Sequence, residues 1–348
     1  MPVSRDEVLW CYRLLLGREP ESEKVIQEHM QSVDRKSLLK DFLSSAEFSG
    51  PAVPSEFQFT EGTISSLPMD LNALDIDVDV TRQQLVAILR RIKAAWEHLG
   101  ITRAHHSVLT GPEYLPDNLV GSIDDFWASG VNEVEIIKKM LARHGQGELR
   151  NKVSVEYGCG VGRITVPLAT ECGHVHAYDI SSAHLSHAKS RAQSLARSNV
   201  TFHICSENPI EPLQECDFFY SHIVFQHNPP PIIKILVQRA LQSLRPHGIA
   251  IFQVPTYMRN YQFKISQYLK GDIVNDMEMH CLPQQVIFDI INSENCALLE
   301  TREDGSTGFP MSNTFIVKKL RAKSTGAKPS GRLGLLNRFR LGRDKSPY

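Results

Sequence analysis

Apolar residues recur at helical spacing near the start of the chain. One face of the first predicted helix carries Val8, Tyr12, Leu15 and Leu16. Gly17 ends this helix, a second helix is predicted from Glu21, and a third from Arg35 to Leu43. We therefore expect residues 1–50 to form a small helical unit.

The periodicity disappears after residue 50 and returns near residue 81. Residues 51–80 are rich in Pro, Ser and acidic residues, which is typical of a linker. Thr81 is a good N-cap for a helix over Gln83 to Leu99, and another helix is predicted from Asp124 to His144.

From residue 152 onward, short apolar stretches alternate with helical patterns. Strands are predicted at 152–155, 174–178, 200–205, 216–224 and 249–254, with helices at 164–170, 232–244 and 284–292. This alternation is typical of an α/β fold with a parallel sheet. Residues 297–302 and 314–319 are predicted to form a closing hairpin.

Composition narrows the class of protein. The 348 residues are 42% hydrophobic, enough for a globular core, and the net charge of −1 predicts no overall attraction to nucleic acid or membrane. The first residues lack the pattern of a signal peptide, and no apolar run approaches the roughly 18 residues of a membrane span. Seven cysteines without a C-x-x-C pair indicate reduced thiols in a cytoplasmic protein, and no metal site is evident.

A glycine-rich loop lies where the first strand of this region meets a helix. Gly158, Gly160 and Gly162 alternate with other residues there, and Glu156 precedes them. Glycine permits a tight turn and a close approach of backbone to a ligand at a helix N-terminus. A dinucleotide fingerprint would place its third glycine one residue later, at Arg163. The other interpretation of the loop is a turn that needs glycine only for packing.

A second acid follows the next strand. Asp179 ends the apolar stretch that begins at His174, at the position where a carboxylate accepts ribose hydroxyls. The acid-x-G-x-G-x-G loop, this acid and the Leu244 to Gly248 turn occur in the order of the class I S-adenosylmethionine-dependent methyltransferases. The chain resembles that family over roughly residues 100–320. The resemblance implies a Rossmann-like seven-stranded sheet whose last strand is antiparallel, in a domain spanning residues 81–320.

The resemblance also implies a set of S-adenosylmethionine-binding residues. Glu156 orients the loop or the methionine amine, Asp179 binds the ribose, and the loop glycines approach the cofactor. The full predicted set is Glu156, Gly158, Cys159, Gly160, Gly162, Asp179, Ile180, Ser206, Glu207 and Ser221. Ile180 is placed along the adenine, and Ser206 stands where the family often has an acid, with Glu207 next to it.

His227 is the predicted general base for an oxygen acceptor. It follows the fourth predicted strand, at the sheet edge where open α/β folds bind ligands, and the run Pro229 to Pro231 restricts its loop. The alternative role is a cap of the loop or a support for the cofactor. His280, His105 and His106 are weaker candidates for the base.

The two ends of the chain suggest partners. Leu-Gly-Arg at 16–18 and Ser-x-Glu-Phe at 45–48 resemble a small bacterial helical module that accompanies other domains, often in proteins that handle cell-surface glycans. Its expected role is docking, or else a cap on the catalytic domain. Residues 321–348 hold eight basic residues against one acid, a net charge of +7, and are predicted to be disordered. This tail either contacts an anionic membrane surface weakly or is only solubilising.

Three functions are consistent with these patterns. The first is methyl transfer from S-adenosylmethionine to a small-molecule or glycan acceptor in the cytoplasm or at the membrane periphery. The second is a nicotinamide-dependent oxidoreductase, which Arg163 disfavours. The third is a non-catalytic scaffold protein, which the intact glycines and Asp179 disfavour.

Overall fold

A computed structural model of the protein describes residues 3–16, 18–45, 71–205, 211–273, 276–306 and 311–321. The chain divides into two compact units, Met1–Asn72 and Ala73–Tyr348. Each unit has its own hydrophobic core.

The first unit consists of three short helices. They are α1 (Arg5–Leu15), α2 (Glu23–Met30) and α3 (Arg35–Leu43). The predicted third helix is confirmed, whereas the second begins at Glu23 because the side chain of Ser22 caps it. The buried side chains of this unit are Val3, Val8, Tyr12, Ile26, Leu38 and Phe42. Residues 46–48 of the Ser-x-Glu-Phe signature lie outside the described residues.

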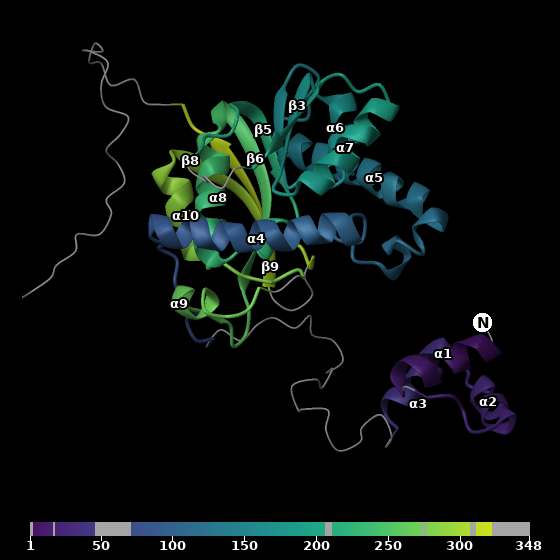
Figure 1. Ribbon diagram of the computed structural model, residues 1–348. Helices are drawn as coiled ribbons and strands as arrows, with labels where there is room; N and C mark the ends of the chain where they lie inside the picture. The colour runs from purple at the N-terminus through teal and green to yellow at the C-terminus, as the bar shows by residue number, and fades with distance from the viewer. Residues whose placement is uncertain are drawn as a thin grey trace, which may run out of the picture. The chain divides into compact units, whose positions relative to one another are not determined.

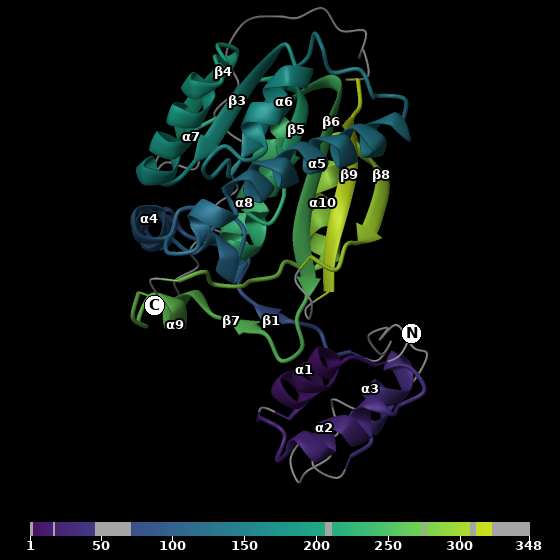
Figure 2. The ribbon, with the colours of Figure 1, turned by 90° about the vertical axis from the view of Figure 1, so that its right-hand side faces the viewer.

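The second unit is built on a seven-stranded sheet, as predicted. Its strands are β2 (Val153–Tyr157), β3 (His174–Asp179), β4 (Val200–Ile204), β5 (Cys216–Ser221), β6 (Leu244–Tyr257), β8 (Cys296–Glu303) and β9 (Met311–Lys319). Their order is β4-β3-β2-β5-β6-β9-β8, and β9 runs antiparallel to both of its neighbours (Figure 2). This Rossmann-like arrangement brings the carboxyl ends of β2, β3 and β5 together at one edge.

Helices cover both faces of the sheet (Figure 1). They are α4 (Arg82–Thr102), α5 (Ile123–Ala142), α6 (Thr165–Glu171), α7 (Ser182–Ser194), α8 (Pro230–Gln242), α9 (Ile265–Tyr268) and α10 (Gln284–Ser293). Apolar residues of α4, α8 and α10 share one core with the sheet, and those of α5 and α6 share another. Single turns lie at Pro112–Tyr114, Leu119–Gly121 and Phe225–His227.

The N-terminal edge of the second unit precedes the predicted boundary at residue 81. Strand β1 (Asp75–Ile76) pairs with β7 (Gln262–Phe263), so residues from Ala73 onward belong to this unit. Thr81 caps α4 as predicted, and its hydroxyl accepts a hydrogen bond from the Gln84 N–H group.

Strand β5 is shorter than the sequence predicted. Its apolar pattern suggested a strand to Val224, but the strand ends at Ser221. Ile223 has φ +55°, outside the extended region, and its N–H group donates to Gln253 Oε1 at 3.1 Å instead of to a strand. His222 therefore lies directly after the strand, and His227 ends a separate turn of 3-10 helix.

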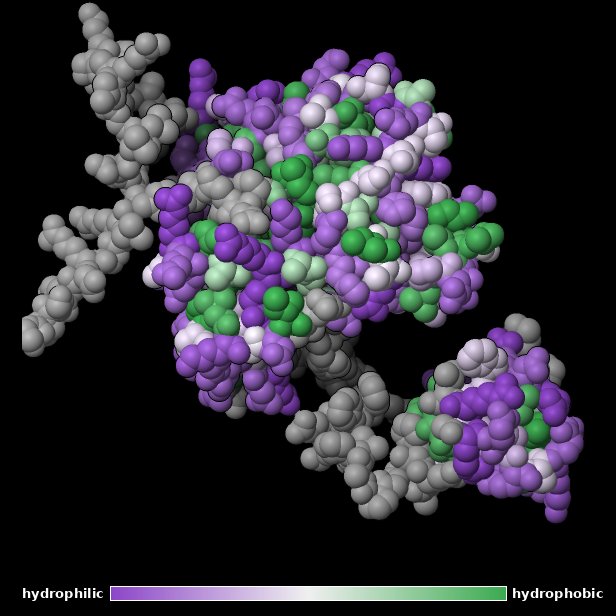
Figure 3. Space-filling model, viewed as in Figure 1, coloured by the Kyte–Doolittle hydropathy of each residue, from purple (hydrophilic) through white to green (hydrophobic). Residues whose placement is uncertain are grey.

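Hydrophilic residues predominate on the face of the second unit seen in Figure 3, where apolar residues form several separate groups. Of the helices described, none combines the length and apolarity needed to cross a membrane. The basic residues 322–348 lie outside the described residues.

Candidate active site

The glycine loop forms one wall of a pocket at the carboxyl ends of β2 and β3. Gly158 and Gly160 line this pocket and have φ values of +78° and +53°. A Cβ atom on Gly160 would stand 2.6 Å from Val108 Cγ2. A side chain at this position would therefore clash with Val108, and the positive φ also favours glycine. Bare backbone therefore faces the pocket, as a cofactor cradle requires.

Gly162 has a different environment. Its φ is +85°, and a Cβ atom there would meet Ala188 of α7 at 3.2 Å. The described lining of the pocket does not include Gly162. This glycine allows the loop to pack against α7, so its predicted approach to the cofactor stays a prediction.

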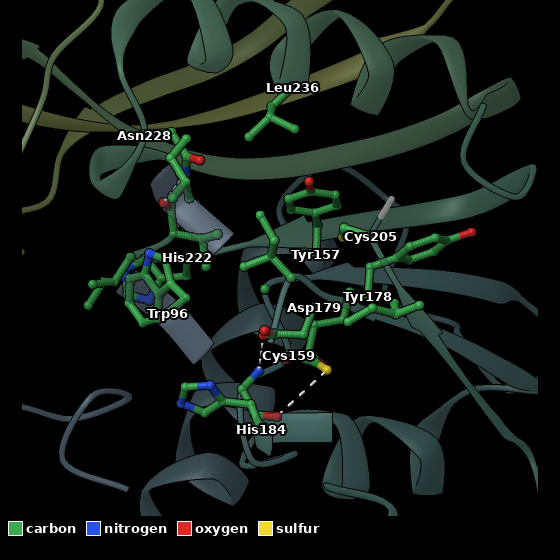
Figure 4. Close-up of a pocket in the computed structure, with 18 of the residues that line it drawn as sticks. Trp96, Tyr157, Cys159, Tyr178, Asp179, His184, Cys205, His222, Asn228 and Leu236 are labelled. Carbon is green, nitrogen blue, oxygen red and sulfur yellow. Dashed lines mark hydrogen bonds between the residues drawn. The ribbon is translucent and has the colours of Figure 1, made fainter. Parts of the chain in front are cut away.

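Asp179 joins the loop to the neighbouring strand. Its Oδ2 accepts a hydrogen bond from the Gly160 N–H group at 2.8 Å (dashed in Figure 4), and its Oδ1 accepts one from the Ser181 N–H group at 2.9 Å. Burial raises the pKa of this carboxyl, and nearby His184 and the backbone N–H groups of Ser181, Gly160 and Ile180 oppose the rise. The carboxylate oxygens keep acceptor capacity for a ligand in the pocket.

Glu156 is a second buried acid on the pocket wall. The Thr165 hydroxyl donates to its Oε2 at 2.5 Å, which ties the end of β2 to the start of α6. Burial raises the pKa of Glu156 to about 8, although the Thr165 hydrogen bond and the charge of Arg163 lower it. At neutral pH this side chain is therefore mostly protonated.

Arg163 brings a positive charge to the same pocket. Its side chain is buried, Nη1 donates to the Ser129 hydroxyl at 3.2 Å, and Nε has no hydrogen-bond partner among the described residues. A buried donor without a partner is expected where a ligand supplies the missing acceptor. The residues present thus fit a ligand with an anionic or polar group near Arg163 and hydroxyls near Asp179.

The structure brings together six of the predicted site residues. Glu156, Gly158, Cys159, Gly160, Asp179 and Ile180 all line the pocket. Burial raises the pKa of the Cys159 thiol far above its usual range, so this cysteine is an unreactive filler. Ser221 is buried, and its hydroxyl donates to the Tyr157 carbonyl at 2.9 Å, which joins the ends of β5 and β2. Ser206 and Glu207 lie outside the described residues.

Several pocket residues were not predicted from the sequence. Trp96, Tyr157, Tyr178, His184, Cys205, His222 and Asn228 also line the pocket (Figure 4). Tyr157 lies between Glu156 and Gly158 at the glycine-rich loop, and Trp96 lies in the helix predicted over Gln83 to Leu99. The sequence pattern does not indicate that either side chain lines the pocket. The predicted strand 216–224 contained His222, so the sequence did not indicate that this residue follows the end of the strand.

His227 is buried and bonded through both ring nitrogens. Its Nδ1 donates to the Glu278 carbonyl at 2.8 Å, and its Nε2 accepts from the Gln226 amide at 3.2 Å. Burial lowers its pKa to about 4, and its ring lies 5.3 Å from that of Trp96. The described lining of the cofactor pocket does not include His227. Its role as the base stays a prediction, and that role would require one of these bonds to break.

His222 is the pocket histidine next to a carboxylate. Its Nδ1 lies 3.2 Å from Glu133 Oε1, on α5, and its Nε2 lies 3.3 Å from the Ser306 hydroxyl. Tyr220 also donates a short hydrogen bond to Glu133. Burial opposes ionisation of Glu133, but the bonds from His222 and Tyr220 and the charge of Arg163 lower its pKa to about 2.

Parts of this chain are similar to known proteins. Residues 155–248 match the family model described as a methyltransferase domain. A search of curated proteins found no match. Among solved structures, magnesium protoporphyrin IX methyltransferase from Synechocystis PCC 6803 with bound SAH is 20% identical, with a TM-score of 0.43 over 57% of this chain and 87% of that one. An S-adenosylmethionine-dependent methyltransferase from Clostridium acetobutylicum ATCC 824 is 13% identical, with a TM-score of 0.40 over 57% and 92%.

Proposed function

We propose that this chain is a class I S-adenosylmethionine-dependent methyltransferase, with S-adenosylmethionine as its cofactor, and that it methylates an oxygen atom of a small-molecule or glycan acceptor. The cofactor supplies a methyl group already activated by its sulfonium. The protein must therefore bind the cofactor, align the acceptor with the methyl group and exclude water.

The glycine loop and the two buried acids support specific binding roles. We assign the backbone of Gly158 and Gly160 to close contact with the cofactor, Asp179 to its ribose hydroxyls, and Ile180 to its adenine. Glu156 orients the loop through Thr165. We also assign Ser206 and Glu207 to contacts near the adenine.

The carboxylate of Asp179 is the observation that carries the proposal. It holds the Gly160 N–H group and still lines the pocket, so one side chain couples the loop to the ligand. An oxygen acceptor is supported by a histidine and hydroxyl side chains close to the pocket, and a glycan acceptor by the resemblance of residues 1–50 alone.

Calorimetry of the full chain with S-adenosylmethionine, its demethylated product and NAD tests the proposal. We expect the first two to bind, and Asp179→Ala to weaken binding by roughly 1.5–3 kcal/mol through loss of charge-assisted hydrogen bonds. Asp217→Ala is the matched control. The Asp217 carboxylate also accepts a hydrogen bond from a backbone N–H group, that of Val153 at 2.9 Å, but it lies near the start of β5 and does not line the pocket. Binding of NAD alone would replace methyl transfer with an oxidoreductase function, and binding of none of the three would leave the scaffold function.

We also propose partners for the terminal segments. The support for docking through residues 1–50 is their separate core. The support for weak contact of residues 321–348 with an anionic membrane surface is their net charge of +7, from eight basic residues and one acid. With these contacts the protein would act in the cytoplasm, at the membrane periphery.

A further inference from the structure

His222 lies at the carboxyl end of β5, in the described lining of the pocket. It follows the last residue of β5, Ser221, and the turn at Ile223 takes the chain out of the sheet immediately afterwards. In open α/β folds ligands bind at the carboxyl ends of the strands. His222 lines the pocket, and its side chain is 21% exposed.

The two ring nitrogens of His222 have different partners. A charged Glu133 can only accept hydrogen bonds, so Nδ1 carries the proton that faces it. In the neutral ring Nε2 then has a free lone pair, and the Ser306 hydroxyl, 3.3 Å away, donates to it. Ser306 is not part of the described lining of the pocket, so the base role requires this 3.3 Å hydrogen bond to be exchanged for one from the acceptor hydroxyl.

The charged groups around Glu133 favour this arrangement. Tyr220 donates to the carboxylate from the sheet, and Arg163 places a positive charge beside it. The acid is therefore ionised and held in place before any proton moves, which is the arrangement that orients a histidine base.

Building on the methyl transfer proposed above, we propose that His222 is the general base of this reaction and that Glu133 is its positioning residue. As the acceptor oxygen forms its bond to the methyl carbon, the bond from that carbon to sulfur breaks and its electron pair stays on sulfur. The proton of the acceptor hydroxyl passes to His222 Nε2. The positive charge of the sulfonium is thereby replaced by that of an imidazolium next to Glu133.

His184 is the other histidine in the described lining of the pocket, and it is less suitable. Its Nε2 is bonded to the Ser107 hydroxyl at 2.8 Å, a shorter bond than the 3.3 Å between His222 Nε2 and Ser306, and its ring packs 6.1 Å from Trp96. It stands next to Asp179, in the part of the pocket assigned to the cofactor.

The protonated nitrogen of His222 provides a test that needs no acceptor. In ¹⁵N NMR of the full chain with S-adenosylhomocysteine at pH 8.5, we expect neutral His222 to carry its proton on Nδ1, with the signal assigned by its loss in His222→Asn. Glu133→Gln should redistribute the proton between the two nitrogens, and Glu133→Asp should retain the wild-type pattern. A proton on Nε2 in the wild-type protein would overturn the proposal.

Turnover gives the second test. Catechol, phenol and methyl glucoside serve as oxygen-acceptor probes with radiolabelled S-adenosylmethionine. With any probe that accepts the methyl group, Glu133→Gln should lower kcat roughly tenfold or more with little change in KM for the cofactor, and Glu133→Asp should restore part of it. If none of the three probes accepts the methyl group, the position of the proton on the His222 ring, measured by NMR, is the deciding result.

Glu300→Gln is the matched control for the Glu133 variant. Glu300 pairs with His144 at 2.9 Å, and its side chain is 14% exposed against 17% for Glu133. Neither member of that pair lines the pocket. An equal loss of kcat in Glu300→Gln would overturn the proposal. Absence of cofactor binding in calorimetry would instead remove the proposed function, so the two failures are distinguishable.

Discussion

His222 and His227 lie on the same connection after β5 but have different surroundings. His222 lines the pocket, with one ring nitrogen next to the charged carboxylate of Glu133 and the other 3.3 Å from the Ser306 hydroxyl. His227 is buried beside Trp96, and the backbone carbonyl of Glu278 and the amide of Gln226 occupy both of its nitrogens. Proximity to the active site in sequence therefore does not by itself assign a role, and our proposal rests on the partners of each ring and on its place in the pocket lining.

The largest expected effect is on turnover. His222→Asn should lower kcat ~10²-fold or more, because a positioned base is lost, while cofactor affinity stays nearly intact. His227→Asn should change kcat by less than about threefold in the folded protein. Calorimetry and methyl transfer on the same two variants check this, with His144→Asn as a control outside the pocket. The comparison fails if His227→Asn loses turnover while His222→Asn keeps it, which would make His227 the base.

For the free energy of unfolding, we expect substitution of His227 to have a larger effect than substitution of His222. His227→Ala is expected to lower the free energy of unfolding by about 1–3 kcal/mol, because it removes the partner of the Glu278 carbonyl and one partner of the buried Gln226 amide. His222→Ala should cost less, since water can reach that site and Tyr220 still donates to Glu133. Urea unfolding of both variants measures the difference. Equal losses would contradict the contrast in burial.

The pH dependence of stability tests the burial of His227 directly. Its pKa is about 4 in the folded protein against 6.5 when exposed, so the unfolded chain binds more protons between these values. The contribution of the neutral ring is complete above pH 6.5 and is lost as the pH falls toward 4. Unfolding free energies at several pH values should therefore decline less steeply in His227→Asn than in the wild-type protein. An unchanged slope would mean that this ring is not buried in its neutral form.

The smallest expected effect concerns Glu156, which contrasts with the charged Glu133. With a pKa of about 8, Glu156 is mostly uncharged at neutral pH, and a glutamine has nearly the same shape. Glu156→Gln should therefore weaken S-adenosylmethionine binding less than about threefold at pH 7, with a larger difference above pH 8 where the wild-type acid gains its charge. Calorimetry at pH 6.5, 7.5 and 8.5 measures this. A large loss at pH 6.5 would show that the acid is charged in the folded protein.

The sequence by itself determined the parts of the protein that depend on neighbouring residues. The spacing of Gly158, Gly160 and Asp179 predicted the loop and its carboxylate, because a strand, a tight turn and a helix leave their marks on consecutive residues. The alternation of strands and helices likewise predicted an α/β fold with a parallel sheet, and the family resemblance implied the seven-stranded sheet, which the structure confirms.

Only the tertiary structure decided how His222 and His227 differ. An apolar run does not reveal where its strand ends. The turn at Ile223 depends on Gln253 of the neighbouring strand β6, whose side-chain oxygen accepts a hydrogen bond from the Ile223 N–H group. Glu133 comes from a helix 89 positions before His222, and the packing of that helix on the sheet brings the two together. Such contacts join residues that are distant in the chain, and no local pattern records them, because each depends on how separate elements pack in space.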